Sequence, residues 1–320
     1  MPYTLRSARQ LIVLGVAVSA GCATLSHKPS ATAAAPVTTP TAARASARDA
    51  SNAPRRATIA RGHVGPMDST RARQLYVSND PKDLPRANFD AQVLAKARTD
   101  SIYAARFKGV VDFQKITYKS TADGMEIPAY LFAPINKRGA KGHAAMVWVH
   151  GGVHGDWNQA MLPFVKEAVD RGYVIVAPDY RGSTGHGEAL HQAIDYGGNE
   201  VVDVMTAVDF LKTLPYVDMD RVGMMGWSHG GFITFLNATT ATTPLKAAAA
   251  IVPVTNLVFR LSYKGPGYQR DYAAESTIRG LPFEKPDEYI KRSPLYHVEN
   301  LKIPVLVHVS TNDLDVNYVE

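Results

Sequence analysis

The residues best suited to chemistry in this chain lie in the segment Gly226–Gly231, with the sequence Gly-Trp-Ser-His-Gly-Gly. An apolar run precedes it at 221–225, and an apolar helical pattern follows it at 232–236. This order predicts a strand, a sharp turn with Ser228 at its apex, and a helix. Glycines fit such a turn because larger residues would clash, and the helix N–H groups would favour negative charge beside the serine. We therefore predict Ser228 as a nucleophile; the alternative is a plain structural turn.

A glycine-containing segment earlier in the chain indicates where the negative charge of a reaction would be held. His150-Gly151-Gly152 directly follows the apolar run 144–149. Residues without a Cβ atom let the backbone approach a substrate closely. We predict an oxyanion hole made by the N–H groups of Gly152 and His229, with a connecting glycine turn as the alternative. His150 itself is expected to be a structural hydrogen-bonding residue.

An acidic residue suited to orienting a catalytic histidine lies near the carboxyl end. Asp313 follows the apolar run 304–308 and lies downstream of Ser228, in agreement with the chain order serine, acid, histidine. Its carboxylate would orient the histidine and stabilise the imidazolium. Asp315 competes for this role, and a solvated turn carboxylate is the third possibility.

The histidine of such a triad is not found after the acid. All ten histidines precede Asp313, and the chain continues for seven residues beyond it. His229 would be a poor base because adjacent side chains at a sharp turn point apart. We therefore expect the catalytic histidine, with a last strand and a helix, to lie beyond residue 320. Without them we expect the present chain to be inactive.

Apolar patterns around these motifs predict the elements that position them. Strands are expected at 113–118, 127–132, 144–149, 173–177, 247–252 and 304–308, and helices at 157–169 and 199–214. Strands that alternate with helices indicate a mostly parallel sheet with helices on both faces. The active groups of such a sheet lie at the carboxyl ends of its strands, where Gly152, Ser228 and Asp313 can converge.

The amino end has the pattern of an export signal. Two arginines precede the apolar run 11–20, which is too short to span a bilayer, and small residues follow it. We predict a signal peptide over residues 1–21. Cys22, the only cysteine, resembles the lipidated cysteine of a bacterial lipoprotein, although Ser19 stands where leucine is usual. A different cleavage site and a buried structural cysteine are the alternatives.

Two further segments precede the predicted catalytic domain. Residues 22–61 are rich in Ala, Thr, Pro and Ser, and such a composition cannot bury enough surface to offset its conformational entropy. We predict a flexible tether there. Residues 62–112 are expected to form a partly helical extension. Apolar residues at helical spacing predict a helix over 89–105, packed on the domain edge: Val93, Leu94, Ala97 and Ile102.

Charge and composition argue against several classes of function. The net charge is +6, but several arginines lie before residue 62, and no basic stripe is interleaved with aromatic residues. We therefore expect no nucleic-acid partner. The sequence contains no metal-binding motif, and we expect no cofactor.

Several motifs together resemble the catalytic domain of the prolyl oligopeptidase family of serine peptidases. They occur in the order of that family over residues 113–320: His150-Gly151-Gly152, Asp179-Tyr180-Arg181-Gly182-Ser183-Thr184-Gly185, Glu200 to Asp203, Asp220-Arg221-Val222-Gly223, Gly226–Gly231, Ser293-Pro294-Leu295 and Asp313-Leu314-Asp315-Val316. The resemblance implies an α/β-hydrolase fold with Ser228 as nucleophile and Asp313 as acid. It also implies that Gly152 and His229 donate to the oxyanion and that Arg181 is structural.

The chain departs from the family pattern in two ways. Many family members carry an amino-terminal β-propeller that restricts substrates to short peptides. We expect none here, because only 112 residues precede position 113 and many of them belong to the tether. In addition, Val153 stands after His-Gly-Gly where proline is frequent in the family.

The sequence thus predicts an exported α/β-hydrolase, incomplete at its carboxyl end, that cleaves short peptides through an acyl-enzyme on Ser228. We expect it in the periplasm or on the outer surface of the cell envelope, anchored by a lipid on Cys22. A carboxylesterase acting on small esters is one alternative, because fold and triad do not separate the two activities. A non-catalytic envelope binding protein is another. The oligomeric state is left open.

Overall fold

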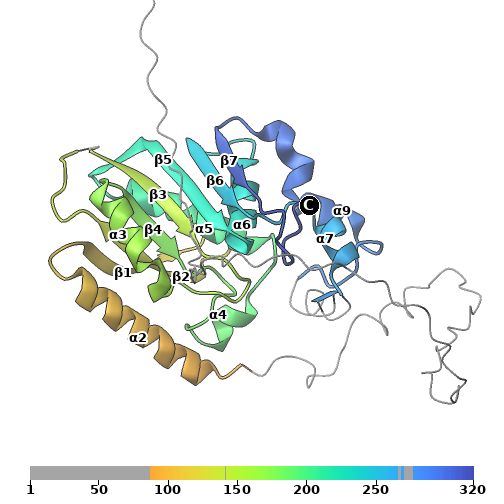
Figure 1. Ribbon diagram of the computed structural model, residues 1–320, viewed down its shortest axis with the longest axis horizontal. Coiled ribbons are helices and arrows are strands. Elements are labelled where there is room, and N and C mark those ends of the chain that lie inside the picture. The colour runs from red at the N-terminus through yellow and green to blue at the C-terminus, as the bar shows by residue number, and fades with distance from the viewer. Residues whose placement is uncertain (1–86, 141, 266–267, 270–276) are drawn as a thin grey trace, which may run out of the picture. The chain divides into compact units, whose positions relative to one another are not determined.

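A computed structural model of the chain describes residues 87–140, 142–265, 268–269 and 277–320. They form an open sheet with helices packed against it (Figure 1). The predicted signal peptide, Cys22, the tether and residues 62–86 of the predicted extension lie outside the described residues. No helix in the described ranges has both the length and the apolar character that crossing a membrane requires.

Seven strands form the sheet in the order β1-β2-β4-β3-β5-β6-β7. Their bounds are Asp112–Lys119 (β1), Glu126–Ala133 (β2), His143–Val149 (β3), Val174–Pro178 (β4), Val217–Trp227 (β5), Ala247–Ile251 (β6) and Val305–His308 (β7). β2 pairs antiparallel with both β1 and β4, whereas the strands from β4 to β7 pair in parallel. Every predicted strand overlaps one of these seven. The mostly parallel sheet is that of an α/β-hydrolase, as predicted.

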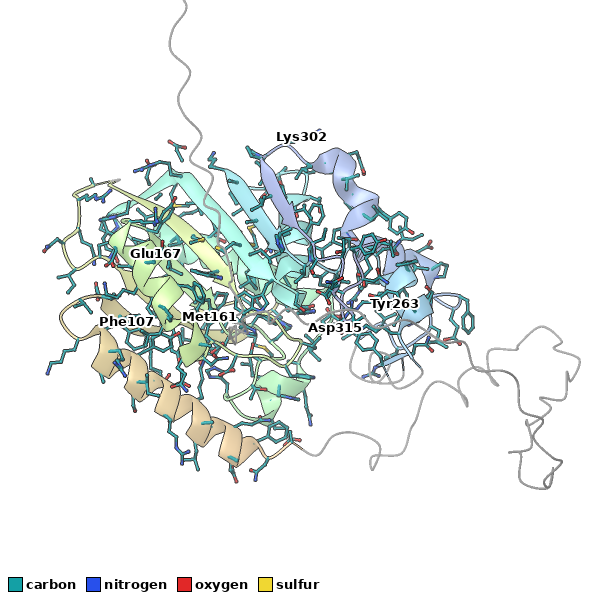
Figure 2. The ribbon with its side chains drawn as sticks, in the orientation of Figure 1. Phe107, Met161, Glu167, Tyr263, Lys302 and Asp315 are labelled. Atoms are coloured by element: carbon teal, nitrogen blue, oxygen red, sulfur yellow. The ribbon has the colours of Figure 1, made fainter. Side chains whose placement is uncertain are left out.

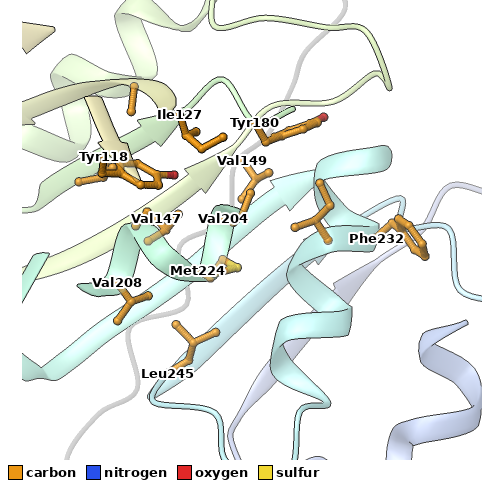
Figure 3. Packing of buried hydrophobic residues seen from close by; sticks show 14 of the residues in the cluster. Tyr118, Ile127, Val147, Val149, Tyr180, Val204, Val208, Met224, Phe232 and Leu245 are labelled. Carbon is orange, nitrogen blue, oxygen red and sulfur yellow. The ribbon is translucent and has the colours of Figure 1, made fainter. Parts of the chain in front are cut away.

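Helices cover both faces of this sheet. On one face, α5 (Asn199–Lys212) and α6 (His229–Ala238) pack on the strands, and Figure 3 shows Val204 and Phe232 among the buried side chains there. On the other face lie α2 (Phe89–Phe107) and α3 (Leu162–Asp170). β4 is buried over its whole length, as expected for a continuous apolar run covered from both sides.

Shorter helical segments connect the larger elements. They are η2 (Gln159–Met161), α4 (Glu188–Gln192), α7 (Leu257–Tyr263), α9 (Pro286–Lys291) and η3 (Pro294–Asn300). The helix predicted at 157–169 is divided into η2 and α3. Pro163 lies in the first turn of α3, the position where proline is tolerated because its missing N–H is not needed.

Helix α2 confirms the helix predicted at 89–105, but the face expected to pack was wrong. Val93 and Leu94 are 43% and 62% exposed. The buried face carries other side chains: Lys96, Thr99, Tyr103 and Phe107. The two aromatic rings explain this choice, because they bury more area than Val93 and Leu94 would and join a cluster of rings from β1 and β2.

The parallel strands end together at the edge that carries the candidate residues. Val149 at the end of β3 lies opposite Gly226 of β5. Trp227 of β5 lies opposite Ile251 of β6, which in turn lies opposite His308 of β7. The segments that follow β3, β5 and β7 therefore leave the sheet at one edge.

Candidate active site

Ser228 occupies the single position between a strand and a helix. β5 ends at Trp227 and α6 begins at His229. Ser228 has φ 54° and ψ −122°, and a positive φ is disfavoured for residues with a side chain. Its N–H donates to the carbonyl of Ile251 at 2.8 Å, and its carbonyl accepts the N–H of Phe232 at 2.9 Å. The strained backbone is thus held from both sides, which is the geometry of a nucleophile elbow.

Three glycines let the elbow pack this closely. A Cβ atom on Gly226 would lie 2.4 Å from the carbonyl oxygen of Gly230. On Gly230 it would lie 2.4 Å from the carbonyl oxygen of His150, and on Gly231 2.8 Å from that of Ile251. Backbone atoms do not yield to such contacts, so these positions require glycine. The first turn of α6 therefore lies directly against the backbone of the neighbouring strands.

The two predicted oxyanion donors lie on segments that this packing brings together. His229 is the first residue of α6, so its N–H has no acceptor within the helix. Gly152, with φ 81°, belongs to the segment after β3. A Cβ atom on Gly151 would lie 2.5 Å from Nε1 of Trp227, which shows how closely this segment approaches the elbow. The placement agrees with an oxyanion hole, whose function stays a prediction.

Tyr180 anchors the segment that carries Gly152, a role that the sequence analysis did not assign. Its hydroxyl lies 2.8 Å from the carbonyl oxygen of Gly152 and 3.2 Å from that of His150. The ring is fully buried and stacks on the ring of His150, with centroids 4.3 Å apart. The available signal was a tyrosine two residues after the end of β4, the strand that pairs with β3.

Asp179, the residue before Tyr180, is a buried carboxylate joined to helix α2. Its Oδ1 accepts the N–H of Trp157 at 2.7 Å. Its Oδ2 lies 2.5 Å from Nζ of Lys96 and 2.8 Å from Nε2 of His186. Burial raises the pKa of Asp179, but Lys96 and His186 outweigh it and hold the pKa well below its ordinary value. The carboxylate therefore stays charged, and an ion pair ties α2 to the loop after β4.

The two candidate acids have different surroundings. Asp315, which Figure 2 labels near Tyr263, is the first of them. It is 72% exposed, pairs with Lys264, and lies 3.8 Å from Arg260. Its hydrogen bond with Lys264 is the main cause of its lowered pKa. Asp313 instead accepts two N–H groups of its own turn through Oδ1, at 2.8 and 2.9 Å. Among the described residues it has no cationic partner, so its second oxygen is available to a histidine. This difference favours Asp313 as the acid.

The described histidines make no hydrogen bond or ion pair with Asp313. His150 has Nδ1 3.0 Å from the carbonyl of Gly151 and Nε2 2.9 Å from the hydroxyl of Ser183, so both nitrogens are occupied. It is a structural hydrogen-bonding residue, as expected. His229 is buried beneath the elbow. The position of the general base therefore stays a prediction.

A family model matches more than half of this chain. The match covers residues 154–320, and the model describes the prolyl oligopeptidase family. The chain belongs to the prolyl oligopeptidase family. Members of this family are serine peptidases, and a solved family structure shares the α/β-hydrolase fold described above.

Individual proteins of the prolyl oligopeptidase family resemble the chain over a similar region. It is 30% identical to the uncharacterized peptidase YuxL of Bacillus subtilis, over 61% of this chain and 29% of that protein. It is 28% identical to dipeptidyl-peptidase 5 of Porphyromonas gingivalis, over 59% of this chain and 28% of that protein. An acylaminoacyl peptidase in complex with Z-Gly-Gly-Phe-chloromethyl ketone superposes with a TM-score of 0.58 and 25% identity, covering 68% and 35% of the two chains. The chain thus spans less than a third of these curated relatives.

Arg181 has a structural role in this prolyl oligopeptidase family domain, as the sequence implied. It is 3% exposed. Its guanidinium contacts Asp203 of α5 at 2.8 Å and Asp123 of the β1–β2 turn at 2.9 Å. Both partners lie away from the elbow in the chain, so the arginine joins the hairpin, the loop after β4 and α5.

His150 makes the stability of the domain depend on pH. Burial lowers the pKa of His150 from 6.5 to about 4, although Asp179 opposes this shift. Between these values the folded state binds fewer protons than the unfolded state. The free energy of unfolding should therefore fall as the pH decreases from 6.5 to 4, by about 3 kcal/mol from this residue. Urea unfolding at pH 7 and at pH 4 measures the change.

The variant His150→Asn isolates this contribution from those of the carboxylates. Its amide retains a donor near the Nδ1 position but does not titrate. We expect the variant to lose less stability than the wild type between pH 7 and pH 4. Equal losses for the two proteins would show that His150 does not control the pH dependence.

Proposed function

We propose that this chain carries the centre of a serine peptidase that cleaves short peptides through an acyl-enzyme on Ser228. The observation that carries the proposal is the backbone of Ser228, held at φ 54° between strand and helix. In the proposal, Ser228 attacks the substrate carbonyl, and the N–H groups of Gly152 and His229 stabilise the oxyanion. Asp313 orients a histidine that takes the serine proton and returns it to the leaving amine.

The relatives support the substrate class in this proposal. One is named a dipeptidyl-peptidase and another an acylaminoacyl peptidase, and both names describe enzymes that act on peptides. The export signal and a lipid on Cys22 belong to the same proposal and rest on the sequence alone. They would place the enzyme in the periplasm or on the outer surface of the cell envelope.

Ser228→Ala should abolish labelling by a fluorophosphonate and lower peptide hydrolysis by at least about 10³-fold, because the attacking oxygen is lost. The protein is expressed from its complete reading frame, labelled, and analysed by intact mass. A panel of short peptides and a panel of acyl esters are assayed in parallel. Ser101→Ala removes an exposed hydroxyl on α2 and should label like the wild type.

Two results would contradict the proposal in different ways. A folded wild-type protein that is not labelled at Ser228 would indicate a binding protein without catalysis. A labelled protein that turns over esters and no peptide would be a carboxylesterase on the same fold.

A further inference from the structure

The side chain of His229 is buried beneath the elbow, where no described residue makes a hydrogen bond with its ring. It is 2% exposed, and neither Nδ1 nor Nε2 has a hydrogen bond within the described part of the chain. The rings of Tyr180, Tyr196 and Phe232 surround it, with centroids at 5.8, 4.7 and 5.4 Å. An imidazole enclosed in this way costs free energy unless a polar group compensates it. A group that compensates the buried imidazole should therefore lie near this position, directly after Ser228.

Glu200 provides a charged partner for this ring. Its Oε1 lies 3.5 Å from Nε2 of His229, and the residue is fully buried. Glu200 belongs to the first turn of α5, where the helix dipole favours a negative charge. Its two oxygens accept the N–H groups of Gly197 and Gly198. The carboxylate is thus held from the α5 side while it faces the first residue of α6.

We propose that Glu200 is a positioning residue for the oxyanion hole. The 3.5 Å contact places a carboxylate, which only accepts hydrogen bonds, against the Nε2 edge of His229 and thereby fixes the orientation of its ring. The ring in turn fixes the residue whose backbone N–H faces the reacting carbonyl. The role of that N–H rests on the proposed function, but the contact between the two side chains does not.

This anchoring matters because α6 begins without a side-chain cap. Ser228 lies at the N-cap position, and its hydroxyl accepts no hydrogen bond from the first turn. The usual cap is therefore missing where the donor geometry has to be exact. A small rotation of the first turn would move the His229 N–H away from the oxyanion, and hydrogen bonds weaken steeply with misalignment. The pair with Glu200 opposes that rotation from a second helix.

Glu200→Gln tests the proposal with little change in volume. The amide oxygen can still accept a glycine N–H, while the negative charge is lost. We expect kcat for peptide hydrolysis to fall about 10- to 100-fold with KM unchanged, because the oxyanion donor acts mainly in the transition state. Asp209→Asn removes an exposed carboxylate from the same helix and should leave both constants unchanged.

A double-mutant cycle separates positioning from packing. His229→Gln retains a donor that can reach Glu200 and should therefore lose less of kcat than His229→Leu does. The kcat of His229→Leu should fall by as much as the kcat of Glu200→Gln. If the two residues act as one unit, the double variant Glu200→Gln/His229→Leu should lose no more than either single variant.

A second readout does not depend on catalysis. Selective ¹⁵N-histidine labelling restricts the backbone amide signals to histidines, and the signal of His229 is identified by its loss in His229→Gln. We expect Glu200→Gln to shift this signal and Asp209→Asn to leave it in place.

The results separate this inference from the proposed function. The inference fails if Glu200→Gln changes neither kcat nor the His229 amide signal. It also fails if the decrease in kcat of Glu200→Gln adds to that of His229→Leu in the double variant. In either case Glu200 only caps α5. If the wild-type protein hydrolyses nothing, the proposed function fails, and the His229 amide signal alone decides the inference.

Discussion

Gly230→Ala is expected to destabilise the domain by at least about 3 kcal/mol. The added Cβ atom would lie 2.4 Å from the carbonyl oxygen of His150 and 2.5 Å from that of Val149. Both oxygens belong to the backbone around the end of β3, so no side-chain rotation can relieve the clash. Either α6 moves away from β3 or the strand bends, and both movements displace Ser228. Urea unfolding at pH 7 measures the loss.

Gly265→Ala is the matched control for this experiment. Among the described residues, its added Cβ atom would meet no atom within 4 Å, and Gly265 does not have a positive φ. Replacement at such a site is neutral or slightly stabilising, because it restricts the unfolded chain. If the two variants had the same free energy of unfolding, α6 would not pack on β3 as closely as described.

Lys96→Met should lower the free energy of unfolding by about 3 to 5 kcal/mol, because it leaves a buried charge without its main partner. Lys96 and Asp179 are 4% and 2% exposed and lie 2.5 Å apart. Methionine preserves most of the apolar stem of the lysine, so the loss reports on the charge. Calorimetry or urea unfolding at pH 7 gives the difference. Limited proteolysis should then cut within α2 faster than in the wild type.

Lys115→Met provides a control with the same ion-pair distance. Lys115 lies 2.5 Å from Asp100, but the lysine is 62% exposed, so its removal should cost less than about 1 kcal/mol. The double variant Lys96→Met/Asp179→Asn should recover part of the stability lost in Lys96→Met, because no unpaired charge is left. If Lys96→Met and Lys115→Met lowered the free energy of unfolding equally, burial would not determine the contribution of these ion pairs.

The sheet could be predicted from the sequence because several of its strands have continuous apolar runs and β1 has an alternating pattern. β4 is such a run, and so are the segments that became β3 and β6. The helices α7 and α9 have seven and six residues, too few for a helical period to stand out, so the sequence does not predict them. Apolar spacing predicts helix α2 but not its packing face, because that face carries Lys96, whose partner Asp179 lies far away in the chain.

The elbow could be predicted because its glycines and serine are adjacent in the chain, and one local pattern describes them. The contacts that support it could not be predicted in the same way. Lys96 and Asp179 are far apart in the sequence, and Glu200 meets His229 from another helix. A charged residue has no local pattern that indicates burial, because its burial depends on a partner that only the fold supplies. The difference between Asp313 and Asp315 likewise came from their neighbours in space.

The order of the strands has a practical consequence for the boundaries of a recombinant gene. The family match begins at residue 154, whereas β1, β2 and β3 all precede that position. Among the described strands, β4 pairs only with β2 and β3, so a gene trimmed to the matched region would encode a strand with neither of these neighbours. It would also omit the lysine that neutralises Asp179. The smallest segment that can fold as described begins no later than Phe89, far ahead of the boundary that homology suggests.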